Sequence, residues 1–587
     1  MSEDSNLNDA ALRDRAVAAA RGDAPFDLLL SGGSVADVAL GEIRAADVGL
    51  VGPLIASVHP PGARGDAGRV RDVSGHIVAP GFIDSHMHVE SSMVAPEAYA
   101  RAVLPRGVTT AVWDPHEFAN VAGLAGMDYA LDAAGRAAMR LLPLVPSCVP
   151  SAPGFEASGA SFDAEAIRAA LERPGTAGLA EVMDIAAVVR RAPRMRAILQ
   201  AALDSGKPLN GHARSIGGAD LQAYLASGIS SDHEITSGAD LLEKLRAGAW
   251  VELRGSHDHL LPAAVEALAT LPIWPQTLTL CSDDVFADDL LESGGLDDVI
   301  RRLIGYGLPP MQALQAATLN GARRLGRADL GLVAPGRRGD LVLLRDLERV
   351  EVADVLFDGV EVNARPVRCP ARPPFALSDS VHLAPVAPEA FRVPATGPSV
   401  RIATIDQPRF TAWGEVEAEV AGGHVVLPED CIHIAVLHRH GQADPAPRMG
   451  FLRGWGTWRG AFATTVSHDS HNLTVFGGGE DDLAAAANAV IAMRGGMAVA
   501  RDGAVIARLP LPNGGLASEA PLAEVARSLI ALRTAMEEVV TWEPPYLVFK
   551  ALVGATLACN PGPHQTDLGI ADPLERILMP SPVLPVR

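Results

Sequence analysis

The stretch "GFIDSHMHVESS", from Gly81 to Ser92, joins a short apolar run to two histidines that are separated by one residue. Phe82 and Ile83 predict a buried strand, and His86 and His88 follow where that strand should end. In an extended segment, residues i and i+2 point to the same side, so both imidazoles can reach one ion. A His-x-His pair alone is a weak signal, because such pairs are common on surfaces, and its meaning depends on the rest of the chain.

The size and composition of the chain limit its function class. It has 587 residues, which predicts roughly two to four domains. Its 49 Lys and Arg against 70 Asp and Glu give a net charge of −21, which argues against nucleic acid or an anionic membrane surface as a partner. The N-terminus is too polar for a secretory signal, and no run approaches the roughly 20 apolar residues of a membrane span. Five scattered cysteines without CxxC favour reduced thiols and a cytoplasmic location.

The segment 81–330 alternates short apolar runs with longer Ala/Leu/Arg-rich stretches of helical character. Strands are predicted at "GFIDSH", "GVTTAVW", "RLLPLVPS", "TAGLAEV", "KPLNGH", "GISSDH", "WVELRGS" and "TLTLCSDD". Eight strand–helix units in about 250 residues predict an α/β fold, a metal-dependent (β/α)₈ TIM-like barrel.

The flanking segments have a different texture. Residues 1–24 form an Ala-rich, charged leader that predicts a helix. Residues 25–80 and 331–372 both have short apolar runs broken by Gly and Asp, which predicts one small β-sandwich domain interrupted by the barrel. Residues 380–587 mix strand and helix patterns and predict a C-terminal α+β domain, with the Pro-rich stretch 365–375 as the boundary.

Polar residues follow most of the predicted central strands, at the ends where such barrels carry their chemistry. Neutral imidazoles and carboxylates at these positions are the ligands that zinc, manganese or iron(II) prefer. In strand order, the candidates are His86 and His88 after the first; Asp114, His116 and Glu117 after the second; Glu181 on the fourth; His212 on the fifth; His233 on the sixth; and Asp283 with Asp284 on the eighth.

Each candidate also has a simpler explanation. His212 could be a hydrogen-bonded core histidine, His233 a surface turn residue, "DPHE" a turn, and Asp283 with Asp284 a helix N-cap. Glu181 lies in the apolar stretch "GLAEVMD", where an unpaired carboxylate would be costly and a cation is the simplest partner. Taken together, the candidates favour a metal site.

Several of these motifs resemble the amidohydrolase superfamily, and more closely its family of bacterial adenine deaminases. The resemblance runs from about Phe26 to the C-terminus and rests on "PGFIDSHMHVESSM", "DPHEFANV", "NGHA", "SDHE", "CSDD", "SHDSHN", "LPLPNGGLAS" and "TDLGIAD". It implies hydrolytic deamination of the free base adenine to hypoxanthine and ammonia, in purine salvage or catabolism. The alternatives are an amidohydrolase acting on another amino-heterocycle or a cyclic amide, and a relative that has lost its metals and become a scaffold.

The resemblance also implies a binuclear metal centre. His86 and His88 would bind the first ion, His212 and His233 the second, Glu181 both, and Asp283 would complete the first site. The chain has no lysine before Lys207, so it cannot bridge two ions with a carbamylated lysine on the fourth strand, which supports Glu181 in that role. The implied metals are Mn²⁺ or Fe²⁺, with Zn²⁺ as a further candidate.

The implied reaction is attack of a metal-activated hydroxide on C6 of adenine. Asp283 would take the proton of the water and pass it to the departing ammonia. Glu117, at a neighbouring strand end, is the chosen donor of a proton to N1, and Asp284 would hydrogen-bond the purine edge. Asp114 and His116 are further candidates for contact with the substrate.

His468 and His471 lie in "SHDSHN" of the C-terminal segment. They are either part of a polar turn before the strand "NLTVF", or part of a lid that contacts adenine, excludes water or holds a further metal. The stretch "NPGPH" at 560–564 departs from the family pattern and puts a substrate role for that loop in doubt. We expect a small-molecule purine base as the partner, no nucleic acid or membrane, and a homo-oligomer, either a dimer or larger.

Overall fold

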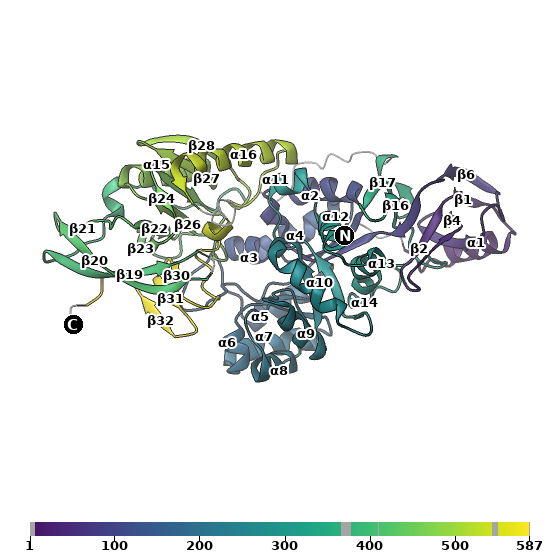
Figure 1. The fold of residues 1–587 in the computed structure, drawn as a ribbon, viewed down its shortest axis with the longest axis horizontal. Helices are drawn as coiled ribbons and strands as arrows, with labels where there is room; N and C mark the ends of the chain where they lie inside the picture. Colours follow the sequence, from purple (N-terminus) through teal and green to yellow (C-terminus); the bar gives the residue numbers. More distant parts are fainter. Residues whose placement is uncertain (1–5, 365–376, 409, 543–549, 586–587) are drawn as a thin grey trace.

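The computed structural model describes residues 6–364, 377–408, 410–542 and 550–585. The N-terminal strands lie at one end of the elongated molecule, the segment from about 81 to 330 in the middle, and the C-terminal segment at the other end (Figure 1). The predicted boundary at 365–375 lies outside the described residues. Among the residues that the structure describes, no helix is long and apolar enough to cross a membrane.

The N-terminal helix is present as predicted. Helix α1 (Ala10–Arg21) starts at Asp9, whose side chain accepts a hydrogen bond from the backbone amide of Leu12, and ends at Gly22, which has a φ of 88°. An Asp N-cap and a left-handed glycine satisfy the free amides and carbonyls at the two ends of a helix.

Two sheets follow in this part of the molecule. One has the order β5-β4-β1-β6 and the other the order β18-β17-β16-β7-β2-β3. Leu341 of β16 pairs with Pro80 of β7, so segments on both sides of the central region share one sheet. Apolar side chains of both sheets, among them Leu30, Val48 and Leu343, share one core. The strands are β1 (Phe26–Ser31), β2 (Ser34–Asp37), β3 (Glu42–Ala45), β4 (Asp47–Val51), β5 (Leu54–His59), β6 (Ala67–Asp72), β7 (Ile77–Pro80), β16 (Leu341–Asp346), β17 (Glu351–Phe357) and β18 (Val360–Glu361).

Every predicted central strand coincides with a strand of the structure. These are β8 (Phe82–Met87), β9 (Val108–Trp113), β10 (Arg140–Pro143), β11 (Leu179–Val182), β12 (Leu209–Gly211), β13 (Ser231–Asp232), β14 (Trp250–Arg254) and β15 (Leu278–Cys281). All residues of β8 and β9 are buried, as expected for parallel strands that are covered on both faces.

The central strands pair in parallel and follow one another around the region. The hydrogen-bonded groups are β8 with β9 and β10, β11 with β12, and β13 with β14 and β15. A parallel bridge from Val145 to Leu179 joins the first group to β11, and another from Met87 to Asp283 joins the segment after β15 back to β8. The carboxyl ends of all these strands therefore meet at one edge.

Helices connect the central strands and lie outside them (Figure 1). They are α2 (Pro96–Val103), α3 (His116–Ala122), α4 (Leu124–Arg136), α5 (Ala164–Leu171), α6 (Ile185–Val189), α7 (Pro193–Asp204), α8 (Gly218–Ala226), α9 (Gly238–Arg246), α10 (Leu261–Ala269), α11 (Ala287–Glu292), α12 (Leu296–Gly305), α13 (Pro310–Gln315) and α14 (Gly321–Arg324). Parallel strands need such crossovers, because a tight turn cannot join them.

The C-terminal segment forms an extended sheet in the order β21-β20-β19-β23-β22-β26-β25-β27-β28. Its strands are β19 (Ser399–Asp406), β20 (Ala412–Ala421), β21 (His424–Val425), β22 (Cys431–Leu437), β23 (Arg448–Arg453), β25 (Ala461–Thr464), β26 (Leu473–Gly477), β27 (Gly496–Arg501) and β28 (Ala504–Pro510). Helix α15 (Glu480–Met493) packs on β25 to β28. Helix α16 (Leu522–Val539) packs on β27, β28 and α11, and so joins this segment to the central region.

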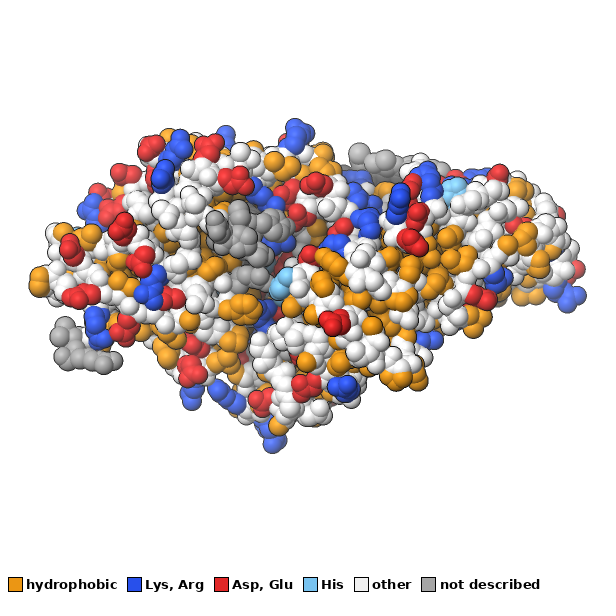
Figure 2. All heavy atoms as spheres, in the orientation of Figure 1, with side chains coloured by type: hydrophobic (Ala, Val, Ile, Leu, Met, Phe, Trp, Pro, Cys, Tyr) orange, Lys and Arg blue, Asp and Glu red, His pale blue; other side chains and the backbone are white. Residues whose placement is uncertain are grey.

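Smaller strands complete the C-terminal segment. They are β24 (Thr457–Trp458) with β29 (Val540–Thr541), and β30 (His564–Thr566), β31 (Gly569–Asp572) and β32 (Ile577–Met579). On the face of the molecule in Figure 2, acidic and basic side chains are interspersed, and no extended basic patch is visible. That face offers no surface typical of nucleic-acid binding.

Candidate metal centre

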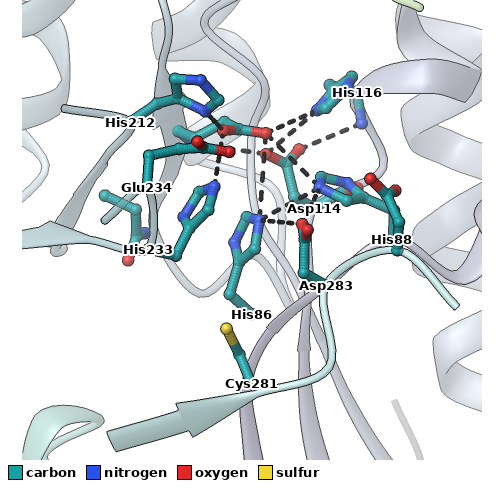
Figure 3. Close-up of polar contacts among 12 residues, drawn as sticks. His86, His88, Asp114, His116, His212, His233, Glu234, Cys281 and Asp283 are labelled. Carbon is teal, nitrogen blue, oxygen red and sulfur yellow. Dashed lines mark hydrogen bonds and ion pairs between the residues drawn. The ribbon is translucent and has the colours of Figure 1, made fainter. Parts of the chain in front are cut away.

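His86, His88 and Asp283 meet at the carboxyl edge of the central strands (Figure 3), and Glu181 lies against both histidines. His88 Nε2 lies 3.2 Å from His86 Nε2, 3.3 Å from Asp283 Oδ1 and 3.5 Å from Glu181 Oε1. All these side chains are buried. They come from β8, β11 and the segment after β15, so the ends of parallel strands bring residues about 200 positions apart into one cluster.

The second oxygen of Glu181 faces the other predicted pair. Glu181 Oε2 lies 2.5 Å from His212 Nδ1 and 3.2 Å from His233 Nε2, while Oε1 faces His88. The two oxygens of one carboxylate thus point toward two pairs of histidines. His233 is 1% exposed, so the interpretation as a surface turn residue is wrong.

The hydrogen bonds of His88 decide what can lie in the middle of the cluster. His88 Nδ1 is 3.0 Å from the carbonyl oxygen of Asp114, so it carries the proton, and Nε2 presents a lone pair. That lone pair faces oxygens of Asp283 and Glu181, which are acceptors too. A divalent cation reconciles converging lone pairs in a buried site, and a histidine whose other nitrogen donates to a carbonyl is typical of metal sites. The residues present therefore fit a transition metal.

Asp283 is held by groups on its far side. Its Oδ2 lies 2.6 Å from Arg254 Nη2 and accepts a hydrogen bond of 2.8 Å from Ser256 Oγ, which leaves Oδ1 for the cluster. Burial alone would raise the pKa of Asp283, but the charge of Arg254 holds that pKa well below its usual range. Asp283 also has a left-handed φ of 58°, an uncommon conformation for a residue with a side chain. The alternative explanation of Asp283 and Asp284 as a helix N-cap is wrong, because Phe286 occupies the N-cap position of α11.

Glu117 lies in the first turn of α3 and is completely buried. Burial raises the pKa of Glu117 well above its usual range, and the neighbouring Glu90 adds to this effect. Ser91 Oγ lies 3.1 Å from Glu117 Oε1 and 2.6 Å from Asp284 Oδ1. Since a hydroxyl has one proton, it can donate to only one of these carboxyls. Its contact with Asp284 is the shorter of the two.

His116 and Glu117 also touch the C-terminal segment, so "DPHE" is more than the turn considered from sequence. His116 Nδ1 lies 3.3 Å from Asp114 Oδ2 and 3.4 Å from Glu181 Oε1, and its Nε2 lies 3.5 Å from Asp469 Oδ1. His468 Nδ1 lies 3.4 Å from Glu117 Oε1. One histidine thus connects the cluster with a C-terminal carboxylate.

A cavity of about 200 Å³ opens over the cluster. Its lining comes from the central region and from the C-terminal segment; among the lining residues are His88, Glu117, Glu181, Asp283, Asp284, Phe286, Trp455, His468, Asp469, Leu557, Asn560 and His564. The cavity is large enough for a small aromatic ligand, and its wall has acids, imidazoles and apolar rings. Two residues of the stretch "NPGPH" belong to this wall.

Known protein families match both segments of the chain that line this cavity. Residues 77–362 match the amidohydrolase family, and residues 408–576 match the adenine deaminase C-terminal domain. "Adenine deaminase 2" of Rhizobium meliloti (strain 1021) is 60% identical over 590 residues, with 100% of this chain and 99% of that protein covered. "Adenine deaminase" of Klebsiella pneumoniae subsp. pneumoniae is 49% identical over 572 residues, with 96% and 95% covered.

The chain belongs to the adenine deaminase family. It is also a member of the metal-dependent amidohydrolases, with mixed α and β structure. The family resemblance drawn from the motifs is therefore confirmed.

The sequence missed several residues of this adenine deaminase family site. Arg254 ends β14, Ser91 follows His88 by three positions, and Glu234 follows His233 directly. Glu234 Oε2 pairs with Arg214 at 2.6 Å, and its Oε1 with Arg254. Position at a strand end was the available signal for Arg254 and Glu234, but arginine is not a metal-binding residue type, and His233 was the one candidate chosen at the strand end that Glu234 shares.

Proposed function

We propose that the chain catalyses the hydrolytic deamination of adenine to hypoxanthine and ammonia in the cavity over the His86 cluster. The observation that carries this proposal is Glu181, whose two oxygens face two histidine pairs in a member of the adenine deaminase family. The substrate is a free purine base, taken into a cavity with apolar and acidic walls.

We assign the two halves of the cluster to two divalent cations. His86, His88 and Asp283 would hold one, His212 and His233 the other, and Glu181 would contact both. Mn²⁺ or Fe²⁺ is our choice, with Zn²⁺ as the remaining candidate, because imidazole and carboxylate ligands suit all three. When bound, two such cations lower the pKa of water and supply hydroxide near neutral pH.

Asp283 handles the proton of the attacking water. Arg254 and Ser256 fix Oδ2, so Oδ1 faces the centre of the cluster. There, Asp283 accepts one proton of the water as the C6 carbon becomes tetrahedral and returns it to the departing amino group, and the second proton, released as the C6 carbonyl forms, restores the carboxyl of Glu117.

Glu117 supplies the proton for N1. A buried, neutral carboxyl can donate a proton to a ring nitrogen without first taking one from solvent. A neutral Glu117 can also be the donor in its contact with Ser91 while Ser91 donates to Asp284. Asp284, which takes the Ser91 proton and lines the cavity, would hydrogen-bond the purine edge.

The finer architecture that supports this function is also a proposal. We interpret residues 81–330 as a (β/α)₈ barrel inserted into a β-sandwich of 25–80 and 331–372, with 380–587 as a C-terminal α+β domain. The strands β8 to β15 pair in parallel within three groups. These groups and the bridge from Met87 to Asp283 support closure of the barrel. A cytoplasmic homo-oligomer stays a prediction.

The test is a comparison of bases. The Mn²⁺-loaded full chain is incubated with adenine, guanine and cytosine, and ultraviolet spectra and released ammonia are followed. We expect the adenine spectrum to become that of hypoxanthine, with one ammonia for each base. Ammonia from guanine or cytosine, and none from adenine, would replace this proposal with another amino-heterocycle deaminase. A chain that binds no metal and releases no ammonia would be a scaffold.

A further inference from the structure

The loop Ser467–Asn472, "SHDSHN", places two histidines against Glu117 from the C-terminal side. His468 Nδ1 lies 3.4 Å from Glu117 Oε1, and His471 Nε2 lies 3.8 Å from Glu117 Oε2. His468 lines the cavity, whereas His471 is completely buried behind it. The two oxygens of Glu117 therefore face different imidazoles.

The backbone around His471 is held by buried hydrogen bonds from other segments. The buried guanidinium of Arg439 donates to the carbonyl of His471 at 2.5 Å and to Gly514 O and Ser380 O at 2.8 Å. Asn472 Nδ2 donates to Ala157 O of the central region at 2.9 Å. His471 has a left-handed φ of 50°. A backbone held in an uncommon conformation by several buried hydrogen bonds indicates a functional constraint.

The tautomer of His471 follows from its neighbour. The backbone amide of Ser467 donates to His471 Nδ1 at 3.2 Å, so Nδ1 carries the lone pair and a neutral ring carries its proton on Nε2. A nitrogen that carries a proton cannot bind a metal ion. The interpretation of His471 as a ligand of a further metal is therefore disfavoured, because it would sacrifice the Ser467 bond.

His471 Nε2 and Glu117 Oε2 lack other partners. Both atoms are buried, and neither has a hydrogen bond to any residue that the structure describes. Their separation of 3.8 Å is longer than a hydrogen bond, so the two side chains must approach each other to form one. Buried donors and acceptors are almost always paired, so two unpaired atoms that face each other form a donor–acceptor pair.

We propose that His471 is a positioning residue that donates its Nε2–H to Glu117 Oε2 and thereby confines the acidic proton of Glu117 to Oε1. An oxygen that accepts from His471 is the carbonyl-type oxygen of the carboxyl. The proton then lies on the oxygen beside Ser91 and the cavity-lining His468. This inference rests on the proposed role of Glu117 as the proton donor to N1.

The first experiment measures kcat and KM for adenine on the Mn²⁺-loaded full chain. We expect His471→Leu to lower kcat by about 10- to 100-fold, the usual range for a hydrogen bond to an active-site carboxyl, with KM changed less than about threefold. His471→Gln should recover most of the loss, because its amide N–H reaches the Nε2 position. His471→Asn reaches only the Nδ1 position and should not. Equal activity of the Gln and Asn variants would overturn the proposal, and this comparison decides even when the Leu variant does not fold.

A double-mutant cycle separates this inference from the proposed function. Glu117→Gln should itself be strongly impaired, and in that background His471→Leu should cost less than about threefold, because the acidic proton that His471 is proposed to position is gone. Additive losses would sink the role of His471 while leaving Glu117 as the acid. Wild-type activity of Glu117→Gln would instead remove the proposed acid, and the inference with it.

A matched control comes from the same segment. His433 lies in β22, is buried, and packs its ring 5.5 Å from that of Phe451, outside the cavity lining. His433→Leu should leave kcat and bound metal unchanged. If His433→Leu lowered kcat as much as His471→Leu does, the loss would come from disturbed folding of the segment. The proposed role of His471 would then be wrong.

Discussion

The central region and the loop Ser467–Asn472 supply groups to the same cavity in different ways. In the central region, one or two residues stand at each of several strand ends, and the parallel pairing of the strands brings them together. In the C-terminal segment, one short loop contributes His468, Asp469 and His471. The first arrangement is set by the sheet, whereas the second is set by the hydrogen bonds of one loop. Damage to the first should remove metal, and damage to the second should impair catalysis with metal retained.

Glu181→Gln should have the largest effect and act on the central region. A neutral amide cannot balance the charge of the two cations that we propose next to its two oxygens, which face His88 and His212. We expect a loss of kcat of at least about 1,000-fold, with less than half of the metal retained, as measured by elemental analysis and adenine turnover.

Glu156→Gln is the control for that substitution. Glu156 is also buried, and burial raises its pKa to about 8, so it is largely neutral at pH 7 and an amide resembles its native form. Activity within about threefold of wild type is expected. Full metal and full turnover in Glu181→Gln would contradict the bridging role.

Asp469→Asn tests the C-terminal side. Its Oδ1 lies 3.5 Å from His116 Nε2, and His116 in turn lies 3.4 Å from Glu181, so a neutral residue 469 weakens the hold on that ring. We expect kcat/KM to fall by about 30-fold, as for a displaced outer-shell group, with bound metal unchanged. Asp444→Asn, at an exposed salt bridge with Arg448, serves as the control. If Asp469→Asn loses metal as Glu181→Gln does, the central region and the loop do not have the separate effects on metal binding and catalysis that we expect.

The sequence predicted the central part of the site and left the C-terminal part open for a physical reason. Apolar runs followed by histidine or aspartate, such as Phe82–Ile83 before His86 and Leu278–Cys281 before Asp283, identify strand ends by local pattern alone. "SHDSHN" was left between a polar turn and a lid, and the structure has features of both. The amide of His471 donates to Ser467 O at 2.9 Å within the turn, while the side chains face Glu117. Contacts between distant segments have no periodicity that a sequence can display.

Asn472→Ala should have a smaller effect, confined to the docking of the loop. Asn472 donates to Ala157 O at 2.9 Å and accepts from the amide of Arg439 at 3.1 Å, so alanine leaves two buried groups unpaired. We expect a loss of about 2 kcal/mol in the free energy of unfolding and a loss of about fivefold in kcat. Urea denaturation and turnover at saturating adenine measure the two. Unchanged kcat together with the loss of stability would mean that the loop is held in place without this bond.

The smallest effect on turnover is expected at His433, where we predict a pH-dependent stability that involves the C-terminal sheet alone. Burial of His433 lowers its pKa to about 4, against about 6.5 in an unfolded chain. Between these values the unfolded chain binds a proton that the folded chain does not. The stability is therefore complete above about pH 6.5 and falls as the pH drops toward 4, by at most about 1.4 kcal/mol for each pH unit.

His433→Phe should remove that share of the slope in urea unfolding curves measured from pH 7 to pH 4.5. Phe451→Leu changes the packing partner without a titrating group, and should lower stability equally at every pH. A slope unchanged in His433→Phe but altered in Phe451→Leu would assign the pH dependence to packing instead. Because His433 lies outside the cavity lining, kcat at pH 7 should not change in its variant, which would distinguish a histidine that only supports the sheet from those that the loop presents to Glu117.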